Sequence, residues 1–252
     1  MLSATNRILL ATMTKEAFQP VRLYYSIPDC SFVTKRLRGL KCMAEDIPGR
    51  CWQWLYDAEA ASLSISAGYD AVPVESRPIV LGRIHVPKKG DMTIQTNSID
   101  RAVAAVRFFA PRLGSEVVAR RCRVINRCFC ADEGRPDELI KLLDKDVTVV
   151  DPRAAEEAFA NDFKGVRSLQ DAERVIEERE QRDIASKKDV PMVEDFPLAP
   201  EEETPDFMHL SINLKLRYAR AVEHWKGNAD LTLLALIRRT MKVGMRRGTT
   251  TP

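Results

Sequence analysis

The sequence feature that most limits the fold is a succession of short strand-like and helix-like runs in the first half of the chain. β-branched and aromatic residues predict strands at Val21–Ile27, in a segment ending at Tyr56, at Ile79–Val86, at Met92–Thr96 and at Val117–Phe129. The runs between them lack the long, regularly alternating helices that a doubly wound parallel sheet requires. We therefore expect an α+β fold, with two small strand and helix units in the N-terminal domain.

One helix is predicted more clearly than the others in this half. Residues Ile99–Leu113 place Val103, Val106 and Phe109 on one side. Asn97 or Ser98 precedes the first turn, where a short polar side chain can cap the free amides. The two strands before this helix are separated by Lys-Lys-Gly-Asp at residues 88–91, which predicts the turn of a hairpin.

Charge is segregated along the chain and indicates how it is divided. Residues 1–130 contain 19 basic and 11 acidic side chains, residues 131–206 contain 11 and 23, and residues 207–252 contain 9 and 2. Basic ends favour a polyanionic partner, and the acidic middle is either a solvated helix and linker or a mimic of that polyanion. The expected units are an α+β domain at 1–150, a charged helical segment at 151–188, an acidic linker at 189–206 and a basic C-terminal module at 207–252.

The C-terminal module changes its hydrophobic period at Leu216–Arg217. Residues 210–216 alternate between apolar and polar, which is typical of a strand with one buried face. Beyond this point the apolar residues recur three or four positions apart as far as Trp225, as they do on a helix. Gly227 is suited to end that helix, and Thr232 to cap a second one.

This order of strand, helix, turn and helix, with Leu236-Ile237-Arg238-Arg239 in the last helix, resembles the ribbon-helix-helix family of DNA-binding repressors. The resemblance implies a homodimer, because such a strand has an unpaired edge until a second copy pairs with it. It also implies double-stranded DNA as the partner, with strand side chains in the major groove and phosphates held by the second helix. The residues assigned to this interface are Ser211, Asn213, Lys215, Thr232, Arg238, Arg239, Lys242, Arg246 and Arg247.

The same residues also fit a different secondary structure. In this alternative, Leu210 and Leu214 continue the stripe of Tyr218, Val222 and Trp225 as one long helix. That helix and the following one would form an amphipathic hairpin docked on the rest of the protein.

Two patterns on the predicted strands are compatible with nucleic-acid binding. Trp52 and Trp54 flank one residue and share a strand face, where they either stack on the bases of a single strand or pack in the core. Arg121, Arg123 and Arg127 share a face by parity. They either contact phosphates or are solvent-exposed or paired with acidic residues.

Signals for catalysis, metals and cofactors are weak. The six cysteines contain no C-x-x-C pair, the three histidines are isolated, and the glycines form no phosphate-binding loop. We therefore expect no catalytic residue, no metal and no cofactor. Reduced thiols fit a cytoplasmic protein, and no apolar run approaches the length of a membrane span.

These observations predict a non-enzymatic DNA-binding protein, regulatory or accessory, that dimerises through its C-terminal module. The alternative is a cytosolic protein-interaction or assembly factor, in which the amphipathic C-terminal tail docks on a partner or on its own domain. A protein partner for the N-terminal domain is compatible with both.

Overall fold

The structure is a computed structural model that describes residues 7–186, 190–198 and 207–239. Its strands are β1 (Val21–Ser26), β2 (Met43–Ile47), β3 (Cys51–Leu55), β4 (Val80–His85), β5 (Met92–Thr96), β6 (Val118–Ile125), β7 (Val147–Val149) and β8 (Val193–Pro197). Its α-helices are α1 (Cys30–Arg38), α2 (Ile99–Leu113), α3 (Pro136–Ile140), α4 (Pro152–Asp162), α5 (Leu169–Ser186) and α6 (Phe207–Trp225). Short 3-10 turns are η1 (Ala58–Ala60), η2 (Tyr69–Ala71), η3 (Val74–Ser76) and η4 (Lys141–Asp144).

The strands form one eight-stranded sheet in the order β2-β3-β4-β5-β1-β6-β8-β7, in which β7 and β8 pair parallel and the other neighbours pair antiparallel. Strand β1 lies between β5 and β6, so these two run parallel to each other. Parallel strands need a crossover connection, and α2 supplies it. The predicted α+β class is confirmed.

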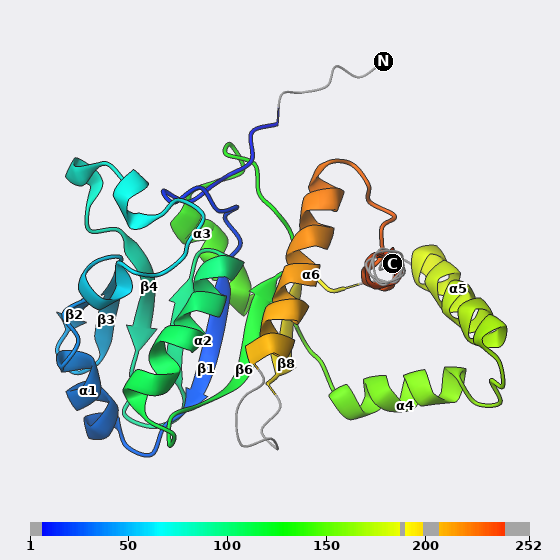
Figure 1. Ribbon diagram of the computed structural model, residues 1–252, viewed down its shortest axis with the longest axis horizontal. Helices are drawn as coiled ribbons and strands as arrows, with labels where there is room; N and C mark the ends of the chain where they lie inside the picture. The colour runs from blue at the N-terminus through cyan, green and yellow to red at the C-terminus, as the bar shows by residue number, and fades with distance from the viewer. Residues whose placement is uncertain (1–6, 187–189, 199–206, 240–252) are drawn as a thin grey trace, which may run out of the picture.

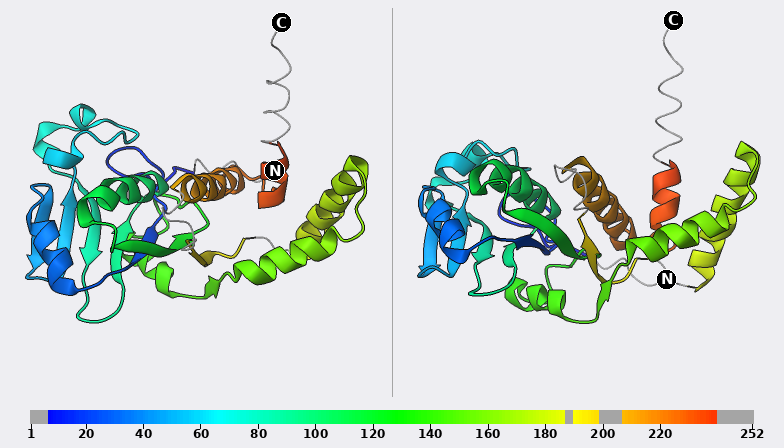
Figure 2. Two further views of the ribbon diagram at one scale, coloured as in Figure 1. Left: turned by 60° about the horizontal axis from the view of Figure 1, so that its bottom comes forward. Right: turned by 90° about the horizontal axis from the view of Figure 1, so that it is seen from below.

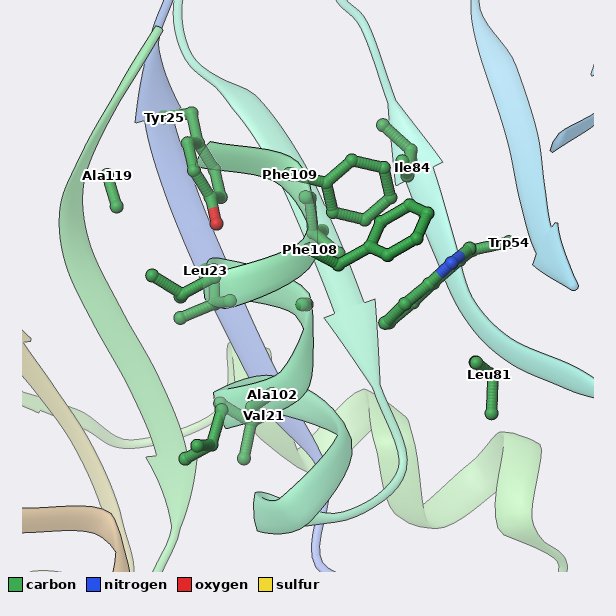
Figure 3. Packing of buried hydrophobic residues seen from close by; sticks show 14 of the residues in the cluster. Val21, Leu23, Tyr25, Trp54, Leu81, Ile84, Ala102, Phe108, Phe109 and Ala119 are labelled. Carbon is green, nitrogen blue, oxygen red and sulfur yellow. The ribbon is translucent and has the colours of Figure 1, made fainter. Parts of the chain in front are cut away.

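Helix α2 covers the centre of one face of the sheet (Figure 1). The Ser98 hydroxyl accepts a hydrogen bond from the Arg101 amide at 3.2 Å, so the predicted cap is present. Phe108 and Phe109 pack against Trp54 of β3, with ring centroids 5.3 and 5.1 Å apart (Figure 3). Trp52 and Trp54 are both buried, so they belong to the core.

Residues Phe207–Trp225 form a single helix, α6, and the strand predicted for residues 210–216 is wrong. The alternation in this segment contains a helical stripe, because Leu210, Leu214, Arg217 and Ala221 recur three or four residues apart and are all buried. Helix α6 lies beside α2 over β6 and β8 (Figure 1). The long helix docked on the rest of the protein, which the sequence offered as an alternative, is the one observed.

Strand β8 lies inside the segment predicted to be an acidic linker, and for residues 193–197 that prediction is wrong. The strand pairs with β6 on one side and with β7 on the other. Its two acidic residues, Glu194 and Asp195, are buried on opposite faces of the sheet, where arginines from other elements neutralise them. Charge therefore does not keep this segment out of the fold.

The charged segment that follows β7 is helical, as predicted. Helices α4 and α5 extend to the side of the sheet beyond α6 (Figure 1). After α6 the chain turns at Gly227, whose φ of 103° is positive as expected for a helix-ending glycine, and residues 233–239 are helical. None of the helices in the described part of the chain has the length and apolar character that a membrane crossing requires.

Candidate nucleic-acid interface

On the sheet face opposite α2 and α6, six side chains from β4, β5, β1 and β6 are polar, and four of these are arginines. Pairing between the strands aligns Arg22 with Gln95 and Arg83 on one side and with Arg123 on the other. The next aligned row contains Tyr24 and Arg121. Figure 2 shows α2 and α6 on one side of the sheet and the short α3 on the other. We call the following six residues the basic face: Arg22, Tyr24, Arg83, Gln95, Arg121 and Arg123.

The basic face follows from the two-residue period of its strands. In β1, Val21 and Leu23 point into the core and are fully buried, so Arg22 and Tyr24 point to the other side. In β6, Cys122 and Val124 are fully buried. The sequence prediction that Arg121 and Arg123 share a strand face is therefore confirmed, whereas Arg127 lies beyond the strand and pairs with Glu133.

The centre of the basic face is an arginine placed on an aromatic ring. The Arg121 guanidinium lies over the Tyr24 ring, with its central carbon 3.8 Å from the ring centroid. Its Nη1 also donates to Asp195 at 2.6 Å. The Tyr24 ring below it is buried, whereas 37% of the Arg121 side chain is exposed. The result is a preorganised, positively charged plane that faces outward.

Two further arginines of this face are held by carboxylates. Arg123 donates to Asp195 at 2.7 and 2.9 Å, and to Asp144 at 3.1 Å. Arg22 donates to both Asp144 oxygens, at 2.6 and 3.1 Å, and its hydrogen bond lowers the pKa of Asp144. The two carboxylates are thus shared by three guanidinium groups, and the cluster keeps a positive charge.

Arg83 adds a charge that is not neutralised in this way. Its side chain is exposed on β4 and makes no hydrogen bond or ion pair with the residues that the structure describes. Gln95, beside it on β5, accepts a hydrogen bond from Arg22 at 3.0 Å. With four guanidinium groups and two carboxylates, the region favours an anionic ligand.

The strand residues predicted to read DNA bases lie on a helix instead. Ser211, Asn213 and Lys215 belong to α6, where Asn213 and Lys215 are exposed and Ser211 is half-buried. The Asn213 side-chain oxygen accepts a hydrogen bond from Arg217 at 3.2 Å. A two-stranded ribbon cannot be built from these residues in this conformation, because their backbone groups are used within α6.

The predicted cap at Thr232 is present. Its hydroxyl accepts a hydrogen bond from the Ala235 amide at 3.1 Å, and its side chain is buried. Arg238, assigned to phosphate, pairs with Glu177 and Glu180 of α5 at 3.1 and 3.2 Å. Arg239 is exposed. Lys242, Arg246 and Arg247 lie outside the described residues.

Sequence reasoning missed the part of the basic face that comes from β1, β4 and β5. The signal for Arg22 and Tyr24 was their parity opposite the apolar Val21 and Leu23. Nothing in the sequence showed that β1 would pair with β6 and so place Tyr24 beside Arg121.

Comparison with known proteins gives no relative for this chain: no protein-family model, no curated protein and no solved structure matches it.

Proposed function

We propose that this protein binds single-stranded nucleic acid through the basic face. The observation that carries the proposal is the Arg121 guanidinium, which lies on the Tyr24 ring and is anchored by Asp195. Arginine planes and aromatic rings on an accessible sheet are the groups on which unpaired bases stack. The surrounding guanidinium groups of Arg22, Arg83 and Arg123 supply attraction for the phosphates.

Double-stranded DNA, the partner predicted from the C-terminal module, is the competing ligand. A stacked plane such as that of Arg121 contributes nothing to a duplex, because the faces of paired bases are covered by their neighbours. The ribbon that would read a major groove has no strand in α6. Single strands are therefore the better fit to the described residues.

The test is a fluorescence anisotropy titration of the full chain with a labelled single-stranded oligonucleotide and with the matching duplex, at several salt concentrations. We expect tighter binding to the single strand. Arg83→Ala should weaken binding and reduce the slope of log affinity against log salt by about 0.7, the value for one lost contact to a single strand. Arg153→Ala, which removes the same charge from an exposed position on α4, is the matched control and should change little.

Stacking is tested separately from charge by Arg121→Lys. Lysine keeps the positive charge but has no planar group, so affinity should fall while the salt slope stays close to that of the unmodified protein. Equal binding by the unmodified protein, Arg83→Ala and Arg121→Lys would rule out the basic face as the binding surface. Tighter binding to the duplex than to the single strand would contradict this proposal and support the prediction of double-stranded DNA as the ligand.

Assembly of the protein with a second copy of itself is a second candidate function, and α4 favours it. Its side chains are exposed at residues 156–160, including Phe159, 48% of which is exposed. Large exposed aromatic residues mark contact surfaces when they cluster, and Phe159 stacks on Phe163 with ring centroids 4.5 Å apart. Light scattering of the full chain tests this. A dimer that Phe159→Glu converts to a monomer would support assembly through α4, and a monomer in both cases would contradict self-assembly there.

A further inference from the structure

A cavity of about 370 Å³ lies where the basic face meets the N-terminal end of α3. Its size falls within the range of small-molecule sites in proteins. Part of its wall is apolar, formed by Val80, Pro136 and Ile140. The cavity shares Arg83 and Gln95 with the basic face, so the two surfaces are continuous.

The polar wall of the cavity carries groups suited to an anion. Arg83 lines it from β4 and Arg135 from the residue before α3. Arg135 pairs only loosely, at 3.4 Å, with Asp137, and both side chains are largely exposed. Guanidinium groups bind phosphate oxygens through paired hydrogen bonds. Two of them at one cavity therefore indicate a phosphate-bearing ligand.

The remaining polar groups are suited to the edge of a nucleobase. Gln95 uses its side-chain oxygen to accept from Arg22, which leaves its amide hydrogens as donors. Asn97 offers a donor and an acceptor, and the Asp137 carboxylate accepts. Bases are distinguished by such arrangements of donors and acceptors on their edges. The apolar wall of Val80, Pro136 and Ile140 provides a surface for the face of a ring.

We infer that this cavity holds one nucleotide of the strand bound on the basic face and gives the protein a preference for one base. The inference rests on the proposed function and adds to it a site of selection. In this arrangement Arg121 stacks on bases without discrimination, whereas Asn97, Gln95 and Asp137 meet the edge of a single base.

The experiment combines two titrations of the full chain. In the first, AMP, GMP, CMP and UMP are added separately and binding is measured by calorimetry. In the second, labelled homo-oligonucleotides of the four bases are titrated by anisotropy. We expect one mononucleotide to bind about tenfold more tightly than the weakest, since one well-made set of base contacts gives discrimination of at least that size. The same base should be preferred in the oligonucleotides.

Two variants separate the cavity from the basic face. Asn97→Ala should remove most of the base preference, so that the four homo-oligonucleotides bind with nearly equal affinity. Arg121→Ala should weaken all four homo-oligonucleotides together and leave mononucleotide binding unchanged. Arg153→Ala again serves as the control.

The outcomes distinguish the two proposals. If homo-oligonucleotides bind and depend on Arg121, but no mononucleotide binds and Asn97→Ala changes no preference, the cavity inference is overturned and the proposed function stands. If no oligonucleotide binds, the proposed function fails, and the inference that rests on it fails too.

Discussion

Arg217 of α6 and Glu194 of β8 form a buried ion pair with two hydrogen bonds, from Nε to Oε2 and from Nη2 to Oε1, each 2.7 Å long. The Asn126 amide donates to the same carboxylate at 3.0 Å, and the Arg217 guanidinium lies 4.6 Å from the centroid of the Phe196 ring. This pair joins α6 to a strand that comes from the acidic part of the chain. It connects a strand predicted to be a linker with a helix for which the sequence fitted both a strand and a helix.

Arg217→Met is expected to lower the free energy of unfolding by about 3–5 kcal/mol, because it leaves the Glu194 carboxylate buried without its cation. The double variant with Glu194→Gln should recover part of the loss, because the remaining side chain is then neutral. Urea unfolding monitored by circular dichroism provides the measurement. Lys226→Met removes the cation of the exposed pair with Glu223 and should change stability by less than about 1 kcal/mol. Similar losses in both single variants would contradict this account.

Phe109→Ala is expected to destabilise the protein by about 3–5 kcal/mol, because this side chain of α2 is fully buried against Trp54 and its removal leaves a cavity. Phe159→Ala makes the same chemical change at a half-exposed position and should cost much less. The shift of the urea midpoint measures both effects. Equal shifts would mean that α2 does not form the centre of the core.

Gly82→Ala is expected to cost about 1–3 kcal/mol through overpacking. A Cβ atom at this position would lie 2.8 Å from the backbone oxygen of Gln95 on the neighbouring strand, so the β4–β5 pair would have to separate. Gly68 has ordinary backbone angles and open space around it, so Gly68→Ala is the matched control and should be neutral. Thermal unfolding of the two variants tests this, and an unchanged melting temperature for Gly82→Ala would contradict the close approach.

Thr232→Ala is expected to destabilise the helix at residues 233–239 by about 1 kcal/mol, because the Ala235 amide loses its partner. Thr232→Ser keeps the hydroxyl and should retain most of the stability. Hydrogen exchange of the Ala235 amide should become faster in the alanine variant only. If exchange is unchanged while duplex DNA binding falls, Thr232 acts in DNA binding, as the family resemblance implies, and not as a cap.

Alkaline pH is expected to destabilise the protein through its buried thiols. Burial raises the pKa of Cys128 to about 11, and burial together with Glu59 raises the pKa of Cys42 to about 12. In the unfolded chain a thiol ionises near pH 8.5. The folded state therefore holds these protons more tightly, and the stability they confer is complete below about pH 8.5 and lost as the pH rises towards 11–12.

The measurement is the free energy of unfolding in urea between pH 7.5 and pH 10, under reducing conditions. Each such thiol contributes a decline of at most about 1.4 kcal/mol per pH unit. Cys128→Ala should make the decline shallower, whereas Cys51→Ala, at a partly exposed position, should leave it unchanged. A decline that is the same in all three proteins would exclude Cys128 as a cause.

Much of the N-terminal half could be predicted because its signals are local. The cap at Ser98, the apolar side of α2 and the turn before β5 each depend on residues within a few positions of one another. The same is true of Thr232, whose hydroxyl meets an amide three residues away. Parity on β6 likewise placed Arg121 and Arg123 on one face before any partner strand was known.

The amino-acid sequence by itself determined these elements, because chain neighbours alone decide a cap, a turn or the side of a strand. Only the tertiary structure decided that residues 193–197 form a strand and residues 210–216 a helix. Acidic residues are disfavoured in strands, but Arg121, Arg123 and Arg217 arrive from distant parts of the chain and neutralise Asp195 and Glu194. Leu210 and Leu214 are four residues apart, which fits both the two-residue period of a strand and the 3.6-residue period of a helix. The helix forms because it buries both side chains in the core with α2 and the sheet. The basic face has the same origin, because pairing of separate strands brings Tyr24 to Arg121.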